Sequence, residues 1–178
     1  MILGMTTATF TLLHVLISLL GIGSGLIVMY GLQTANRLNR WTMFFLVSTA
    51  LTSITGFLFP NEHITPGIVV GILSLLVLAV GIVARYPQRL RGAWRPIYVI
   101  SASVALYFNV FVLVVQLFEK VPALRALAPT QKEPPFGITQ LLVLILFIVA
   151  TVYAVRRFHP SAGSIGTSAS GSTQKRAA

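Results

Sequence analysis

Four strongly polar side chains interrupt the long apolar segments of this chain, and they are the residues best placed to do chemistry. They are His14, Asn109, Gln116 and Gln140. A polar group inside a membrane-spanning segment is costly, so it is a candidate for function by default. Imidazole and carboxamide groups can hydrogen-bond a solute, and imidazole can also ligate a metal or haem iron.

These polar residues are expected to share one half of the molecule, the outer half. Counted along the apolar segments, Gln116 and Gln140 lie within about one helical turn of the outer end, and His14 lies about two turns in. Two threonines of the second segment add hydroxyl groups at similar depth. The sequence thus predicts an outward-facing ligand-binding pocket lined by His14, Thr52, Thr55, Asn109, Gln116 and Gln140. The alternative is that these groups only link neighbouring helices.

His14 also leaves a redox alternative open, in which the chain binds haem or quinone in the same half. Haem iron takes histidine ligands within helix bundles, although the chain has no Cys-x-x-Cys-His attachment motif. A zinc site would require two connecting segments to fold together and bring in His14, His63, Glu62 and Glu119. The cofactor is left open, with haem as one candidate, and no metal ligand is assigned.

Catalysis has little support in the residue types present. The chain contains neither Asp nor Cys, which excludes a Ser-His-Asp triad, paired aspartates and thiol nucleophiles. The glycines of Gly21-Ile22-Gly23-Ser24-Gly25 lie within an apolar segment, without the strand that precedes a nucleotide-binding loop. No acid or lysine lies deep in a segment, as a pump would need. We therefore expect a protein that is not an enzyme, with small-solute transport as a further alternative.

Five apolar segments must position these residues. They cover about 8–32, 41–59, 66–84, 96–118 and 136–155, and each approaches the ~20 residues that a helix needs to cross a ~30 Å hydrocarbon core. With 56% hydrophobic and 9% charged residues, the composition lies outside the range of soluble domains. We predict an all-α domain of five transmembrane helices over residues 1–159 and a disordered cytoplasmic tail at 160–178. The prolines between residues 119 and 135 predict an extended or turning connection.

The charges alternate from one connection to the next. The connections after the first and third segments, together with the tail after the fifth, hold ten of the 13 lysines and arginines. The other two connections hold all three acidic residues. Because cytoplasmic loops carry an excess of Lys and Arg, this pattern places the N-terminus outside and the C-terminus in the cytoplasm. It also explains the net charge of +10 without nucleic acid as a partner.

Two of the basic connections look alike. Arg37-Leu38-Asn39-Arg40-Trp41 and Arg89-Leu90-Arg91-Gly92-Ala93-Trp94 both precede an outward-running segment, which favours a helical hairpin that occurs twice in the chain. The expected partners are the lipid bilayer and either a second membrane protein or further copies of the chain. The favoured function is an accessory membrane component or a small-solute-binding one.

The run Thr55-Gly56-Phe57-Leu58-Phe59-Pro60, with His14 and Ala128-Pro129-Thr130-Gln131, resembles small multi-pass inner-membrane proteins of bacteria that have no assigned activity. The resemblance covers most of the chain. It implies an integral protein of a bacterial inner membrane, and it brings no catalytic residue, cofactor or mechanism. The use of arginine rather than lysine fits a bacterium with a GC-rich genome.

Overall fold

The computed structural model describes residues 2, 4–60 and 65–159, and about 80% of these residues are helical. In chain order, the helices within these ranges are α1 (Thr7–Gln33), α2 (Asn39–Phe57), α3 (Pro66–Arg85), α4 (Trp94–Lys120), α5 (Pro122–Leu127) and α6 (Pro134–Arg157). The predicted all-α fold is confirmed. Glu62, His63 and the predicted tail at 160–178 lie outside the described residues.

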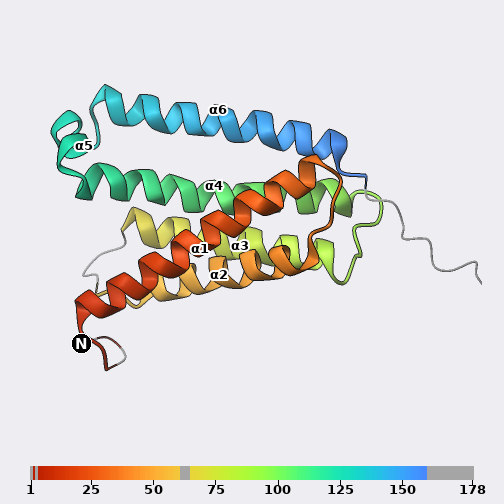
Figure 1. The fold of residues 1–178 in the computed structure, drawn as a ribbon, viewed down its shortest axis with the longest axis horizontal. Coiled ribbons are helices and arrows are strands. Elements are labelled where there is room, and N and C mark those ends of the chain that lie inside the picture. Colours follow the sequence, from red (N-terminus) through yellow and green to blue (C-terminus); the bar gives the residue numbers. More distant parts are fainter. Residues whose placement is uncertain (1, 3, 61–64, 160–178) are drawn as a thin grey trace, which may run out of the picture.

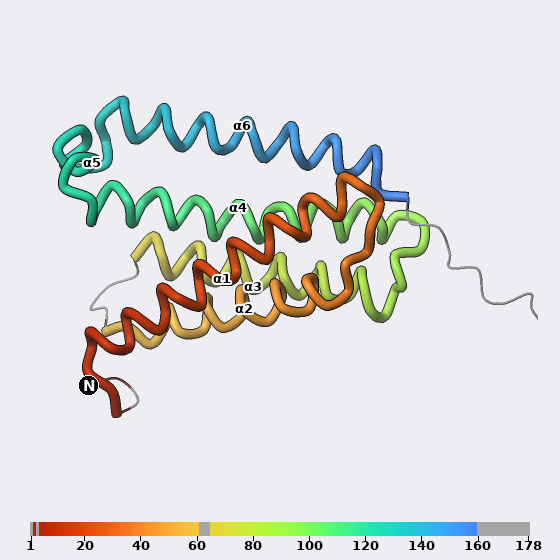
Figure 2. The backbone as a smooth tube through the Cα atoms, in the orientation of Figure 1, coloured from red at the N-terminus to blue at the C-terminus, as the bar shows by residue number. Residues whose placement is uncertain are grey.

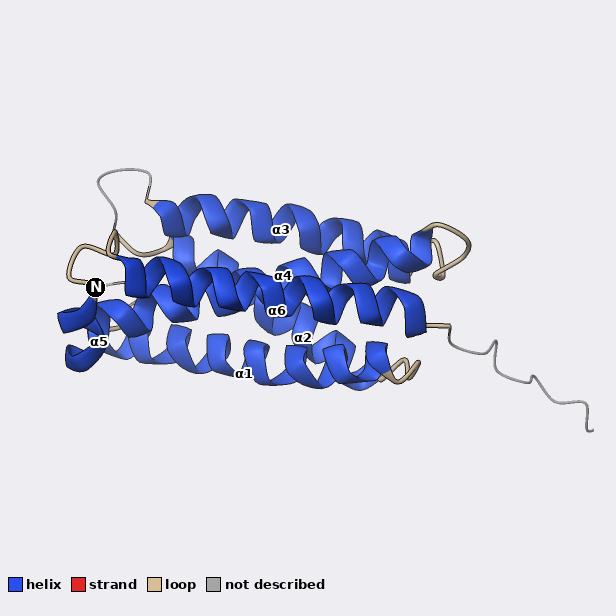
Figure 3. Cartoon of the chain, turned by 90° about the horizontal axis from the view of Figure 1, so that it is seen from above, coloured by secondary structure: helices blue, strands red, loops and turns tan. Residues whose placement is uncertain are grey.

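The five long helices run alternately in opposite directions (Figures 1 and 2). The end where α1, α3 and α6 begin carries the short helix α5, and we name it the α5 end. The opposite end consists of the connections 34–38 and 86–93 and the end of α6, and we name it the arginine end. α1 packs on α2 and α3 on α4, while α6 lies against α4 and α1. Figure 3 shows α1 and α3 on opposite sides of the bundle.

Small residues allow the helices to approach one another closely. A Cβ atom added to Gly25 of α1 would lie 2.5 Å from Cδ1 of Leu106 and 2.8 Å from Cε2 of Phe45. Gly81 of α3 faces Ser101 of α4 in the same way, with 3.3 Å to the serine Cβ. Because lipid supplies little hydrophobic force between helices, close packing of this kind is what holds a membrane bundle together.

The side chains are distributed inside out relative to a soluble protein. Large apolar residues cover the surface, as Leu142 and Leu146 of α6 illustrate with exposed fractions of 62% and 65%. Hydroxyl groups such as those of Ser24, Thr49 and Ser103 are buried. Four helices, α1, α3, α4 and α6, are long and apolar enough to cross a membrane. Together these features indicate a multi-pass membrane protein.

α2 is the predicted segment at 41–59, and it is not among those four helices. Its 19 residues include Arg40 and six Ser and Thr side chains, which lower its mean hydropathy. The sequence predicted five membrane-spanning helices. That α2 is one of them stays a proposal.

The connection between α4 and α6 is partly helical, whereas the prolines predicted an extended or turning connection. Residues Pro122–Leu127 form the helix α5, with Pro122 in its first turn. Pro134 likewise begins α6. Proline is well suited to a first helical turn because the amide proton it lacks has no partner there. α5 and α6 therefore begin at two of the prolines that were expected to keep the chain out of a helix.

Candidate functional site: polar links between helices and a basic cavity

His14 of α1 pairs with Thr55 of α2 towards the α5 end of the bundle. Nδ1 of the imidazole lies 2.8 Å from Oγ1 of Thr55. The threonine hydroxyl donates its proton to the carbonyl oxygen of Leu51 at 2.7 Å, so it accepts the bond from Nδ1 of His14. With this orientation of the hydroxyl, the imidazole is the Nδ1-protonated tautomer and carries its lone pair on Nε2. The ring of Phe59 packs against the imidazole with the centroids 5.3 Å apart and an angle of 88°.

Asn109 of α4 lies deeper in the bundle and links to α2. Its Nδ2 donates to Oγ1 of Thr49 at 3.0 Å, and the two residues are 9% and 0% exposed. Gly21 of α1 completes the contact, because a Cβ there would lie 3.3 Å from Oγ of Ser48 and 3.7 Å from Oγ1 of Thr49. Three helices therefore meet around one buried amide.

The two glutamines occupy different surroundings. Gln140 of α6 is partly buried and donates from Nε2 to the carbonyl oxygen of Phe111 on α4 at 3.2 Å. Its Oε1 is buried and has no hydrogen-bond partner. Gln116 of α4 is exposed and joins none of the other predicted residues. Thr52 lies one turn from Thr55 on α2, and its Oγ1 is buried without a partner.

Four of the six predicted residues, His14, Thr55, Asn109 and Gln140, thus take part in three separate helix-to-helix links, whereas the side chains of Thr52 and Gln116 take part in none. One link joins α1 to α2 through His14, one joins α4 to α2 through Asn109, and one joins α6 to α4 through Gln140. None of the six lines either of the two cavities described below. Among the described residues, no three His, Cys, Asp or Glu side chains gather at a metal-binding distance. The zinc alternative involved Glu62 and His63, which lie outside those residues.

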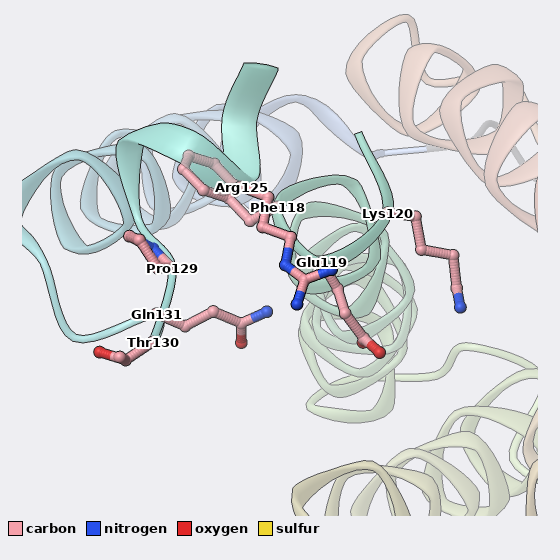
Figure 4. Close-up of a pocket in the computed structure, with 7 residues that line it drawn as sticks. All are labelled: Phe118, Glu119, Lys120, Arg125, Pro129, Thr130 and Gln131. Carbon is pink, nitrogen blue, oxygen red and sulfur yellow. The ribbon is translucent and has the colours of Figure 1, made fainter. Parts of the chain in front are cut away.

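A cavity of about 370 Å³ lies at the α5 end (Figure 4). Figure 4 shows Arg125 of α5 and Gln131 of the following loop directed toward the same space. The lining carries both signs of charge, and it consists of Phe118, Glu119, Lys120, Arg125, Pro129, Thr130 and Gln131.

Glu133 holds the loop beside this cavity. Its carboxylate accepts bonds from the hydroxyl of Thr130 at 2.9 Å and from the backbone N–H of Lys132 at 3.1 Å. Desolvation raises the pKa of Glu133, but these hydrogen bonds outweigh it and place the pKa below its ordinary value of 4.5. The carboxylate, which precedes the first residue of α6, therefore fixes the entry of the chain into that helix.

A second cavity of about 460 Å³ lies at the arginine end. Its lining comes from α2, α3 and the two look-alike connections, and it consists of Arg37, Asn39, Arg40, Met43, Arg85, Tyr86, Arg89 and Leu90. Four of these residues are arginines and none is acidic. The sequence analysis used these arginines to orient the chain and to compare the two connections, and it did not identify them as a site.

Arg85, the last residue of α3, is buried beside this cavity with 8% of its surface exposed. Its Nη2 donates to the carbonyl oxygen of Arg37 at 3.0 Å and to Oδ1 of Asn39 at 2.7 Å. The guanidinium carbon lies 5.0 Å from the ring centroid of Tyr98. Nη1 is buried and has no hydrogen-bond partner. The guanidinium is therefore contacted by neutral hydrogen-bond acceptors and by the rings of Tyr98 and, at 5.9 Å, Tyr86.

The two look-alike connections share one backbone feature beside this cavity. Leu38 and Leu90, the second residue of each stretch, have φ angles of 37° and 60°, a left-handed conformation that is costly for a residue with a side chain. Both side chains turn inward. Leu38 packs against Gly31, and Leu90 packs against the main apolar core. Otherwise the connections differ, because Arg89 also has a positive φ of 52° and α4 begins only at Trp94. The repeat of a helical hairpin stays a prediction.

No protein-family model, curated protein or solved structure matches the chain.

Proposed function

We propose that this chain is a five-span integral protein of a bacterial inner membrane and that it serves as an accessory membrane component rather than as an enzyme. In this proposal α2 supplies the fifth span. α1 and α3 both begin at the α5 end (Figure 1), so the chain between them has to return along the bundle, and α2 makes that return.

The faces of α2 support a position inside a bilayer. Its exposed side chains are bulky and apolar, among them Met43, Phe44 and Val47. Its hydroxyl groups point inward and bond carbonyl oxygens of their own helix, as Ser48 does with Phe44 at 2.7 Å and Ser53 with Thr49 at 3.1 Å. A hydroxyl satisfied in this way can be buried in a membrane helix at small cost. The hydroxyls that lower the mean hydropathy of α2 therefore lie on its inner face, which lipid does not contact, whereas Asn39 and Arg40, which lower it further, lie at the start of the helix.

The arginines support an orientation with the N-terminus outside and the C-terminus in the cytoplasm. Arg125 lies at the α5 end, whereas the other described arginines lie at or next to the arginine end. They are Arg37, Arg40, Arg85, Arg89, Arg91, Arg95, Arg156 and Arg157. An excess of positive charge marks the cytoplasmic side.

The pairing of the polar residues within the spans is the observation that carries the accessory role. The polar groups of His14 and Asn109 bond across helices, so they act as links between helices. α6 is the helix most open to the membrane, since Ala154 is its one buried residue. We infer that the protein works through lateral contacts of this face with another membrane protein or a second copy.

A photo-crosslinker on α6 tests this role in native membranes. The chain has no cysteine, so Leu142→Cys or Leu146→Cys accepts a benzophenone maleimide at one position. The proposal expects a discrete protein adduct from one of these exposed positions and none from the same label on Leu12→Cys of α1, an exposed position near the start of that helix. Labelling of lipid alone from both α6 positions would contradict it.

One observation favours a second function, the binding of a small polar solute. Oγ1 of Thr52 and Oε1 of Gln140 are buried without partners, as they would be if a solute completed their bonds. A candidate solute that raises the melting temperature should then lose this effect in Thr52→Val and Gln140→Leu. Under the accessory proposal, the two variants leave the response to added solutes unchanged. Haem binding would instead give a Soret band that His14→Ala abolishes.

A further inference from the structure

The four arginines around the cavity at the arginine end come from parts of the chain that are far apart in sequence. Arg37 and Arg40 flank the start of α2, and Arg85 and Arg89 flank the end of α3. The fold brings them around one space of about 460 Å³, a volume typical of small-ligand sites. A general excess of cytoplasmic charge would not require this convergence.

Arg85 lacks the partner that a buried arginine normally has. Fully buried arginines are rare unless a carboxylate pairs with them. The two described acidic residues, Glu119 and Glu133, lie at the α5 end of the bundle. Neutral acceptors take both bonds from Nη2 of Arg85, and Nη1 has none. An anion in the adjacent cavity would balance this charge together with those of the three neighbouring arginines.

The chemistry of the lining identifies the kind of anion. Guanidinium groups bind phosphate with paired hydrogen bonds, and they do so better than lysine ammonium groups. Two apolar or amphipathic side chains, Met43 and Tyr86, line the same cavity and are 60% and 49% exposed. Tyrosine favours the headgroup level of a membrane. The lining therefore combines guanidinium groups that suit a phosphate with exposed side chains that suit an amphiphile.

We propose that this cavity binds one phosphate group per chain, held by Arg85 with Arg37, Arg40 and Arg89. The phosphate is borne by an anionic lipid headgroup or by a soluble molecule. Basic pockets between transmembrane helices on the cytoplasmic side commonly take anionic headgroups, which makes phosphatidylglycerol the first probe and inorganic phosphate the second.

The test uses two charge-matched double variants of the full chain in neutral detergent. Arg40→Gln with Arg89→Gln removes two arginines that line the cavity. Arg91→Gln with Arg156→Gln removes two exposed arginines of the same end that do not line it. Neither pair includes Arg85, whose burial could make a substitution harmful to folding. Binding of short-chain phosphatidylglycerol and of inorganic phosphate is measured by native mass spectrometry and by the shift in melting temperature.

We expect saturable binding of one molecule per chain. The double variant Arg40→Gln with Arg89→Gln should weaken this binding by about tenfold or more, since each arginine near a headgroup contributes about a factor of five. The control double variant, Arg91→Gln with Arg156→Gln, should change the affinity less than about threefold. Binding of the lipid without competition from phosphate identifies a headgroup, and binding of phosphate alone identifies a soluble ligand. Equal weakening by both pairs, or the lack of saturable binding to the unaltered chain, would overturn the proposal.

Discussion

Nδ2 of Asn109 on α4 lies 3.0 Å from Oγ1 of Thr49 on α2, and both side chains are buried where α1, α2 and α4 meet. An amide in hydrocarbon must find a partner within the protein. A single hydroxyl on the neighbouring helix provides it here. The contact therefore fixes the rotation of α2 about its axis and turns the other hydroxyls of that helix inward.

The Asn109–Thr49 bond should be measurable as a coupling free energy. Asn109→Leu and Thr49→Val each remove the bond, so the double variant should be less destabilised than the sum of the single ones. The expected coupling is about 0.6–1.7 kcal/mol. Unfolding in mixed micelles of the four proteins of the cycle measures it. Additive effects would mean that the bond contributes nothing to stability.

Two glycines of α1 should respond in opposite ways to alanine. Gly25→Ala places a methyl group 2.5 Å from Leu106 and 2.8 Å from Phe45, so it should destabilise the bundle by about 1–3 kcal/mol. Gly23→Ala has no atom within 4 Å of the new Cβ and should be neutral or slightly stabilising because alanine favours helix. Melting temperatures in one detergent compare them. Equal losses would show that α1 packs through a different face.

The loop before α6 should loosen as the pH falls. The pKa of Glu133 lies below 4.5 because its carboxylate accepts bonds from the hydroxyl and the backbone N–H of Thr130 and from the backbone N–H of Lys132. Those bonds are therefore fully present above the ordinary carboxyl pKa and are lost as the pH falls through the lowered one. Hydrogen exchange at the Thr130 and Lys132 amides, corrected for the intrinsic effect of pH, should lose protection over that interval. Glu133→Gln should lack most of this protection at neutral pH, and strong protection in that variant would refute the assignment.

Much of the helix arrangement is readable from the sequence because long apolar runs and the charges between them are strong signals. The predicted segment at 66–84 became α3 at Pro66–Arg85, and 8–32 became α1 at Thr7–Gln33. Position along a helix can also be predicted, which is why His14 and Asn109 were recognised as polar groups within apolar helices.

The rotation of each helix about its own axis is much harder to predict from the sequence. α2 carries hydroxyls at Thr49, Thr52 and Thr55, and nothing in the sequence shows that Asn109 bonds Thr49 while His14 bonds Thr55. The burial of Arg85 was missed for a related reason. It depends on the connection at 34–38 folding over the end of α3 so that Asn39 and a carbonyl oxygen reach the guanidinium.

The central claim is that α2 crosses the membrane, and labelling on both sides of it provides the most direct test. Thr34 and Pro60 are exposed residues that flank α2, and the cysteine-free chain allows Thr34→Cys and Pro60→Cys to be labelled singly. A maleimide that cannot cross the inner membrane should label Pro60→Cys in intact cells with a permeable outer envelope. It should label Thr34→Cys only after the inner membrane is opened. Labelling of both positions from the same side would show that α2 does not span.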